Sequence, residues 1–188
     1  IASEKGKLIK QLPAKTGLAI INADDLLVQQ AAKETQAQVM TFGKSDKELV
    51  RISEHKPTVT GTTFGFGVRD ETSTLTLPYL LPIHLGGSLA AALCVALDEG
   101  NTLADGCQLI EKNFVMPPGR MSILEGINGS TIVDSSYNAS AQPTLDAIEL
   151  IQSIKSVRKL ALLGDMRELG NKTQEAHEQV IKEAMQVM

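Results

Sequence analysis

The stretch STIVDSSYNAS, residues 130–140, joins a short apolar run to an abruptly polar turn. The run Thr131–Val133 is typical of a buried strand, so Asp134, Tyr137 and Asn138 are expected just beyond the carboxyl end of that strand. In open α/β sheets, this edge is where ligands bind. We therefore interpret these polar residues as members of a candidate ligand site.

The composition argues against some classes of function. The 188 residues include 18 basic and 22 acidic side chains, with a net charge of -4, no basic stripe and few aromatics, so no nucleic-acid partner is expected. No apolar stretch is long enough to span a bilayer, and the first residues lack the core of a signal peptide, so no membrane insertion is expected. The missing initiator Met suggests that the sequence begins within a longer protein.

The first part of the chain predicts a strand–helix–strand unit followed by further strands. Apolar runs at residues 17–25 and 38–43 are of strand type, and residues 26–36 between them have a helical pattern. Residues 49–81 are rich in β-branched residues with Gly turns, which predicts a meander or an extension of the sheet.

Two helices are expected next, over residues 86–100 and 102–114. The first is rich in Ala and Leu and closed by a glycine, and Thr102 could cap the second. Cys94 and Cys107 lie in these helices without the paired spacing of a zinc or redox site. Both cysteines are predicted to be core residues.

The segment VMPPGR, residues 115–120, marks the expected domain boundary. Adjacent prolines cannot continue a helix, and Gly119 frees the backbone to turn. We therefore predict one domain over residues 1–116 and a second over residues 117–188.

The second domain is expected to be a truncated βαβ unit. Asn128 and Gly129 favour a type I′ turn between two strands, and Ser140 could cap the amphipathic helix that follows. The run RKLALLGD, residues 158–165, is interpreted as another buried strand, and a helix closes the sequence. The whole chain is therefore assigned to the α/β class.

Polar residues follow three of the predicted strands. They are Asn22, Asp24 and Asp25 after the first strand, Asp134 to Asn138 after the strand quoted above, and Asp165, Met166 and Glu168 after the last. Such side chains can bind ribose hydroxyls, an adenine edge or an incoming amine. Asp and Asn are also the commonest helix caps and turn formers, which is the alternative at any single position. Three occurrences in one chain favour a site.

Arg120 directly follows the Pro-Pro-Gly segment, where a bidentate donor could reach phosphate across a cleft. The alternative is a surface arginine paired with a nearby carboxylate. His177, on the closing helix, is a candidate ligand or general base, although a histidine facing solvent is the better default, and His84 is discounted similarly.

Several familiar motifs are absent from the sequence. It contains no G-x-x-x-x-G-K-[ST] phosphate loop and no G-x-G-x-x-G dinucleotide fingerprint. It also lacks a G-x-S-x-G elbow and an H-E-x-x-H zinc motif. The chain therefore offers no complete catalytic machine of its own.

Two long segments, PPGRMSILEGINGSTIVDSSYNASAQPTLDAIELI at 117–151 and RKLALLGDMRELGNKTQEAHEQV at 158–180, resemble the C-terminal domain of the Mur ligases. The motifs Gly-Arg-Met, Asp-x-x-Tyr-Asn-Ala and Leu-Gly-Asp-Met-x-Glu-Leu-Gly occur in the family's order and at matching distances. Upstream, IASEKGKLIKQLP at 1–13 and AIINADD at 19–25 resemble the later part of the family's central ATPase domain. The resemblance is weakest from about residue 45 to 80, and it implies a Rossmann-like C-terminal domain.

The resemblance is strongest to the branch of the family that adds D-alanyl-D-alanine to UDP-muramoyl tripeptide, because sister ligases typically carry a histidine-containing turn where this sequence has SYNAS. It implies that ATP phosphorylates the terminal carboxylate of the tripeptide and that the amine of the dipeptide attacks the acyl phosphate. It also implies Mg²⁺, a cytoplasmic bacterial location and a monomer. The family's phosphate loop, its metal ligands and its UDP-binding domain would precede residue 1, so the isolated chain is expected to be inactive.

The resemblance also assigns roles to single residues of this sequence. Asn22 resembles an adenine-contacting asparagine, with Asp24 and Asp25 shaping its turn. Arg120 resembles the arginine that reaches ATP phosphate, and Asp134 the aspartate that holds the ribose.

On the substrate side, the resemblance implies that Tyr137, Asn138 and Ala139 lie near the incoming dipeptide. Three further residues match the family pattern without an individual role, and we group them as candidate substrate-binding residues: Asp165, Glu168 and His177. No metal ligand is assigned within this chain.

One departure from the family pattern stands out. The family usually has a His-Asn-x-x-Asn segment leading into LAA, where this sequence reads HLGGSLAA, and Gly87 is placed opposite the second asparagine. An adenine contact would be lost there. Two alternatives therefore stay open: another amide ligase of the superfamily, of folylpolyglutamate or cyanophycin type, and a non-catalytic nucleotide-binding α/β module.

Overall fold

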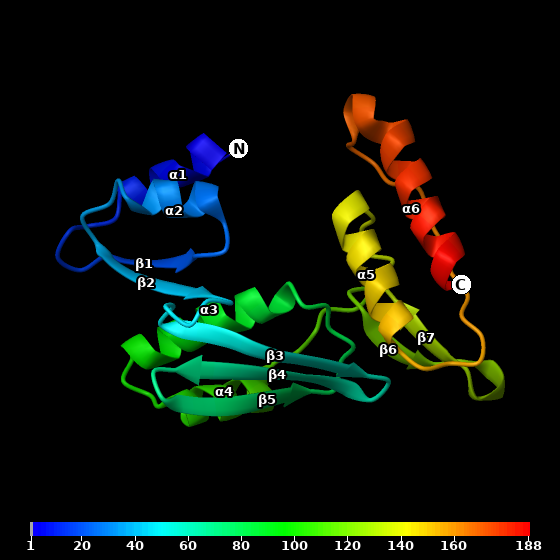
Figure 1. The fold of residues 1–188 in the computed structure, drawn as a ribbon, viewed down its shortest axis with the longest axis horizontal. Coiled ribbons are helices and arrows are strands. Elements are labelled where there is room, and N and C mark those ends of the chain that lie inside the picture. The colour runs from blue at the N-terminus through cyan, green and yellow to red at the C-terminus, as the bar shows by residue number, and fades with distance from the viewer. Residues whose placement is uncertain (1) are drawn as a thin grey trace. The chain divides into compact units, whose positions relative to one another are not determined.

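Five strands form the larger sheet of the structure, a computed structural model that describes residues 2–188. The strands are β1 (Leu18–Asn22), β2 (Gln38–Gly43), β3 (Val50–Thr58), β4 (Gly61–Val68) and β5 (Glu71–Leu77), and they lie side by side in sequence order (Figure 1). The pairs β1–β2 and β2–β3 are parallel, whereas β3 to β5 are joined by tight turns. The predicted strand–helix–strand unit and the predicted meander are therefore confirmed.

Two of the helices, α3 (Leu85–Asp98) and α4 (Leu103–Asn113), pack together in the first part of the chain. Helix α3 ends before Gly100, whose φ of 84° is in the left-handed region that glycine adopts at low cost. Helix α4 begins with a reciprocal cap: Thr102 Oγ1 accepts a hydrogen bond from Asp105 N–H, and the Thr102 hydroxyl and amide donate to Asp105 Oδ2. The predicted cap at Thr102 is confirmed.

The core of this part of the chain is apolar and closely packed. Phe64 and Phe66 of β4 are fully buried and stack with their ring centroids 6.3 Å apart. Cys94 and Cys107 are buried free thiols, as predicted. Burial raises the pKa of the Cys94 thiol to about 11, and burial likewise raises the pKa of Cys107.

The chain divides into two compact units. Unit 1 contains the described residues up to His55 together with Thr63–Thr76 and His84–Asn113. Unit 2 contains Lys56–Thr62, Leu77–Ile83 and Phe114–Met188. Two short segments and residues 114–116, all before the predicted boundary at residues 116/117, therefore belong to it.

Unit 1 also holds two helices at its amino-terminal side, α1 (Ala2–Lys10) and α2 (Leu26–Ala32), which contact each other. Helix α2 was predicted, and it contacts β1. Helix α1 was not predicted; its sequence is polar on average, with three lysines and one glutamate among its nine residues.

Unit 2 is built on an antiparallel hairpin of β6 (Ser122–Glu125) and β7 (Thr131–Asp134), followed by α5 (Ala141–Ser153) and α6 (Thr173–Val187). Leu150 of α5 packs in a cluster with Met121 and Leu80, with Val133 of β7 against it. On its other side, α5 places Ile148 against Ala176, Val180 and Ala184 of α6. Helix α5 therefore has two apolar faces and joins the hairpin to α6.

The predicted hairpin is confirmed, with a longer connection than a two-residue turn. A 3₁₀ turn at Ile127–Gly129 joins the strands, and Asn128 and Gly129 have φ values of 54° and 73°. Ser140 occupies the N-cap position of α5, but its side chain makes no capping hydrogen bond; its carbonyl instead accepts from the amide and hydroxyl of Thr144.

The prediction of a buried strand at residues 158–165 is wrong. This segment forms no strand, and Leu160 and Leu162 are 75% and 102% exposed. An apolar run becomes a buried strand only when a neighbouring strand pairs with it. Within residues 2–188, the sheet of unit 2 contains only β6 and β7, so residues 158–165 have no strand partner.

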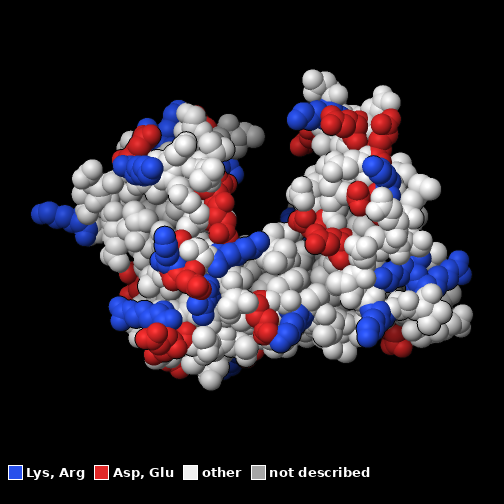
Figure 2. All heavy atoms as spheres, in the orientation of Figure 1, with Lys and Arg blue, Asp and Glu red and all other residues white. Residues whose placement is uncertain are grey.

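No helix within residues 2–188 is long and apolar enough to cross a membrane. On the face shown in Figure 2, basic and acidic side chains are interspersed over each unit. This view gives no sign of a basic stripe of the kind that binds nucleic acid.

Candidate functional site

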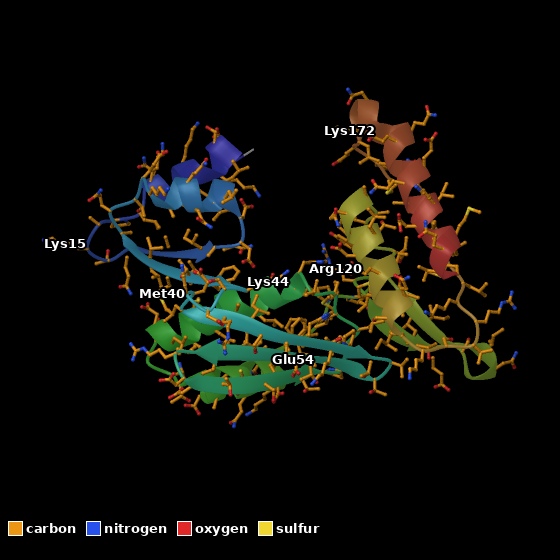
Figure 3. All side chains as sticks on the ribbon, in the orientation of Figure 1. Lys15, Met40, Lys44, Glu54, Arg120 and Lys172 are labelled. Atoms are coloured by element: carbon orange, nitrogen blue, oxygen red, sulfur yellow. The ribbon has the colours of Figure 1, made fainter. Side chains whose placement is uncertain are left out.

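The end of β1 carries the first group of predicted site residues, all within unit 1. The side-chain oxygen of Asn22 accepts a hydrogen bond from Asp24 N–H at 3.0 Å, which closes a local turn. Asp24 Oδ1 in turn accepts from the Lys44 amide at 3.2 Å, so it links this turn to the end of β2. Figure 3 labels Lys44 on that segment.

Asp25 has a helix-capping geometry. Its Oδ1 accepts from the amides of Leu27 and Val28 at 2.8 and 3.2 Å, and its own backbone is extended, as expected for an N-cap. Within residues 2–188, the Asn22 amide nitrogen and the second oxygen of each carboxylate make no hydrogen bond to the protein. The turn thus presents polar groups of both kinds at the carboxyl edge of the sheet.

Gly87 lies on α3, which contacts β2. A Cβ atom at this position would lie 3.3 Å from Cε2 of Phe42, a tight contact with a buried ring. An asparagine at position 87 would therefore require Phe42 to shift.

The second group of predicted residues lies in unit 2 and begins with an unusual backbone around Arg120. Gly119 has a φ of 74° and Met121 a φ of 56°, so left-handed residues flank the arginine on both sides. A methionine rarely adopts this conformation, and Met121 is held in it while 6% exposed within the cluster around Leu150. The exposed Arg120 side chain therefore leaves a fixed stretch of backbone, labelled in Figure 3.

Arg120 lies against Tyr137. The guanidinium carbon of Arg120 is 4.3 Å from the centroid of the Tyr137 ring, a cation–π contact. The backbones of the two segments are also joined, because Tyr137 N–H donates to the Gly119 carbonyl at 3.1 Å. Among residues 2–188, the Arg120 guanidinium forms no ion pair. The alternative prediction, a surface arginine paired with a nearby carboxylate, is therefore wrong.

Asp134 ends β7 and closes the turn that leads to Tyr137. Its Oδ1 accepts from Ser136 N–H at 3.0 Å. Hydrogen bonds from the Ser136 side chain and then from its backbone hold the pKa of the Asp134 carboxyl below its usual range. The group is therefore an ionised acceptor at neutral pH, suited to a ribose hydroxyl.

The two residues after Tyr137 differ in their surroundings. Asn138 is exposed, whereas the Ala139 side chain packs against the apolar cluster around Ile148 and Val180. Ala139 therefore anchors the turn to the core of unit 2, and Asn138 presents its amide to solvent.

His177 holds the third group of predicted residues together. Its Nδ1 lies 2.7 Å from the Thr173 carbonyl, which can only accept, so Nδ1 carries a hydrogen. Nε2 lies 3.1 Å from Met166 N and 3.0 Å from Asp165 Oδ1. Nε2 of a neutral ring accepts from Met166 N–H, whereas Nε2 of a protonated ring donates to Asp165.

Glu168 lies three residues after Asp165 in the same irregular segment and has a φ of 63°, another left-handed residue that is not glycine. The default of a histidine facing solvent is wrong for His177, whose side chain is 28% exposed and fully engaged with this turn. His84 occupies the N-cap position of α3 without a side-chain capping bond.

The structure therefore brings the predicted residues together in three local groups. They are Asn22 with Asp24 and Asp25, Arg120 with Asp134 and Tyr137, and Asp165 with Glu168 and His177. Sequence reasoning missed Met121 and Ser136, which shape the second group. The Asp-x-Ser spacing was a visible signal for Ser136, but nothing in the sequence marks a left-handed Met121.

The polar side chains of the second group, Arg120 and Asp134, limit which ligands could bind there. An unpaired guanidinium and an ionised carboxylate within the same unit are groups of the kinds that can bind the phosphate and the ribose of a nucleotide. No cluster of three or more His, Cys, Asp or Glu side chains able to hold a metal ion occurs in the described part of the chain.

An α/β protein with polar residues at its strand ends and an unpaired arginine belongs to a class that includes many nucleotide-dependent enzymes. Two domain matches identify one family within this class. The Mur ligase middle domain matches residues 1–95, and the Mur ligase, glutamate ligase domain matches residues 119–188. The chain belongs to the Mur ligase family.

Individual relatives agree with this assignment. The chain is 28% identical over 187 residues to the UDP-N-acetylmuramoyl-tripeptide--D-alanyl-D-alanine ligase of Escherichia coli (strain K12), covering 96% of this chain and 39% of that protein. It is 25% identical over 180 residues to the ligase of the same name from Bacillus subtilis (strain 168), covering 95% of this chain and 38% of that protein. The chain thus spans well under half the length of these curated relatives.

Solved structures resemble the fold closely. The crystal structure of MurF ligase from Thermotoga maritima in complex with ADP matches with a TM-score of 0.80 and 25% identity, covering 96% of this chain and 40% of that one. Crystal structure I of MurF from Acinetobacter baumannii matches with a TM-score of 0.78 at 22% identity, covering 94% of this chain and 38% of that one. The second likeness concerns the fold alone.

Proposed function

We propose that the chain is part of an ATP-dependent amide ligase that adds D-alanyl-D-alanine to UDP-N-acetylmuramoyl tripeptide in the bacterial cytoplasm. One observation carries this proposal: relatives named for that reaction align over 96% and 95% of the chain. The ADP complex of a similar structure supports a nucleotide as one ligand.

The proposed reaction has two steps. A carboxylate oxygen of the tripeptide attacks the γ-phosphorus of ATP, which releases ADP and forms an acyl phosphate. The amine of D-alanyl-D-alanine then attacks the acyl carbon, an amide bond forms, and inorganic phosphate leaves with the carboxylate oxygen. Charge stabilisation at phosphate and exclusion of water from the acyl phosphate are the main requirements.

In this proposal, two residues of unit 2 contact the nucleotide. Arg120 donates in-plane hydrogen bonds to phosphate, and the ionised Asp134 accepts from the ribose hydroxyls. In unit 1, Asn22 contacts the adenine through its amide, while Asp24 and Asp25 hold the turn in which Asn22 lies.

The acceptor side is assigned to the remaining residues. Tyr137 and Asn138 lie at the dipeptide, with Ala139 as their anchor in the core. The turn of Asp165 and Glu168, held by His177, binds the other substrate groups. The protein is proposed to act as a monomer, with domains over residues 1–116 and 117–188, and with Mg²⁺ ligands outside the described residues.

Phosphate release by the complete protein tests this function. With ATP and UDP-muramoyl tripeptide present, we expect D-alanyl-D-alanine to stimulate release strongly, and we expect L-glutamate or L-aspartate to have no effect. Stimulation by glutamate alone would instead favour the folylpolyglutamate type. A folylpolyglutamate synthetase matches the fold less closely, with a TM-score of 0.58. Nucleotide binding without turnover under any acceptor would favour the non-catalytic module.

A further inference from the structure

We propose that Tyr137 is a positioning residue for Arg120: its ring is the platform that orients the guanidinium toward an anionic phosphate. This inference deepens the proposed function and rests on it for the identity of the anion. It adds to the proposed place of Tyr137 near the dipeptide a second role, the support of the arginine.

The backbone fixes both partners of the contact. The Gly119 carbonyl accepts from Tyr137 N–H at 3.1 Å, and a Cβ built on Gly119 would lie 3.2 Å from both Cβ and N of Tyr137. The two segments are therefore in van der Waals contact where the side chains begin. Any residue other than glycine at position 119 would both crowd Tyr137 and strain a φ of 74°.

The two residues beside the contact hold it in place. Met121 is buried and left-handed, which fixes the direction in which the preceding Arg120 leaves the backbone. The Asp134–Ser136 hydrogen bond closes the turn that presents Tyr137. The arginine and its platform are thus each supported by neighbouring structure and do not depend on a bound ligand.

Stacking uses the face of the guanidinium and leaves its edge available. The five N–H donors of arginine lie in the plane of the group, so a ring that packs against the face of the group leaves these donors available. An arginine that rests on a ring can therefore donate two parallel hydrogen bonds to a phosphate at the same time. The ring also reduces the number of side-chain conformations that the arginine loses on binding.

Nuclear magnetic resonance of the chain in solution tests the platform without any nucleotide. The Arg120 side-chain protons are expected to show upfield ring-current shifts, which Tyr137→Phe keeps and Tyr137→Leu abolishes. Tyr137 is 68% exposed, so neither replacement removes a core residue. Arg120 protons at ordinary shifts in the unaltered chain would overturn the proposal.

Binding of inorganic tripolyphosphate, measured by calorimetry at low salt, tests the consequence. Tyr137→Leu is expected to weaken binding about 2- to 5-fold, the size of an exposed cation–π contact, and Arg120→Ala to weaken it further. Tyr137→Phe, which keeps the ring, is expected to bind as the unaltered chain does. Equal affinity of the Leu and Phe variants would contradict the platform role.

Failure of this inference and failure of the proposed function are distinguishable. In one outcome, the Arg120 ring-current shifts are observed and tripolyphosphate binding depends on Tyr137, but the complete protein never forms the amide. That result would support the platform role of Tyr137 and contradict the proposed ligase function. If the complete protein forms the amide but Arg120 shows no ring-current shift, the ligase function is supported and the platform role of Tyr137 is contradicted.

Discussion

The guanidinium of Arg120 rests on the ring of Tyr137, 4.3 Å from the ring centroid, while the amide of Tyr137 donates to the carbonyl of Gly119. Side chain and backbone therefore join the segment before β6 to the turn after β7. Asp134, the candidate ribose acceptor, ends β7 just before this turn and belongs to the same unit.

Arg120→Ala in the complete protein is expected to lower kcat on the order of a hundredfold, because one preorganised donor to the developing phosphate charge is lost. Arg120→Lys should recover only part of the rate, since an ammonium group lacks the planar fork and stacks poorly. Initial rates of phosphate release measure both variants. Arg158→Ala, at an exposed arginine with no assigned role, is the matched control, and equal rates for the Arg120 and Arg158 variants would remove Arg120 from the site.

Thr62→Val is expected to lower the free energy of unfolding by about 1–3 kcal/mol. The buried Thr62 hydroxyl donates to the Tyr79 carbonyl and accepts from Leu81 N–H, both at 2.9 Å, and valine leaves these groups without that partner. Urea unfolding with an unchanged m-value measures the loss. Thr63→Val, at an exposed hydroxyl pair with Thr76, is the control and should change stability by about 0.5 kcal/mol or less.

Asp134 is expected to titrate below the ordinary range of an aspartate, and Ser136→Ala should raise its pKa toward that range because the largest cause of the shift is removed. Because the folded pKa is the lower one, the stability from this group is present above the unfolded pKa and is lost as pH falls through the folded pKa. The carboxyl ¹³C resonance followed against pH measures both effects. Ser135→Ala should leave the titration unchanged; an ordinary pKa in the unaltered chain would contradict the assignment.

His177 is expected to be the Nδ1–H tautomer when neutral, which ¹⁵N chemical shifts of the ring report directly. Its replacement by Ala should speed hydrogen exchange of the Met166 amide by up to about tenfold, since that N–H loses its acceptor. Gln174→Ala, which removes an exposed hydrogen bond to Glu178 on the same helix, is the control and should not affect Met166. An Nε2–H tautomer or unchanged exchange would contradict the described hydrogen bonds.

Local patterns predicted much of the fold. The strand ending at Asn22, the helix α2 and the strand β2 follow from apolar periodicity and turn residues within each segment. The cap at Thr102 and the left-handed Gly100 also follow from residue type at a helix end. Each of these features depends on interactions among residues that are close in sequence.

Features that depend on distant residues were not predictable in this way. Residues 158–165 have the composition of a buried strand, yet burial requires a paired neighbour that composition does not reveal, and Leu162 is fully exposed. Met121 is left-handed because the cluster around Leu80 and Leu150 holds its side chain, which no local pattern signals. The contact of Arg120 with Tyr137 depends on both this backbone and the Asp134 turn, so it required the structure.

The most direct test of the central claim is an isotope transfer in the complete protein. UDP-muramoyl tripeptide labelled with ¹⁸O in its terminal carboxylate is incubated with ATP and D-alanyl-D-alanine, and the inorganic phosphate is analysed by mass spectrometry. The acyl phosphate route predicts that one labelled oxygen passes from the carboxylate to the phosphate in each amide-forming turnover. Phosphate without label would mean that water, and not the carboxylate, accepts the phosphoryl group, and it would contradict the proposed ligase.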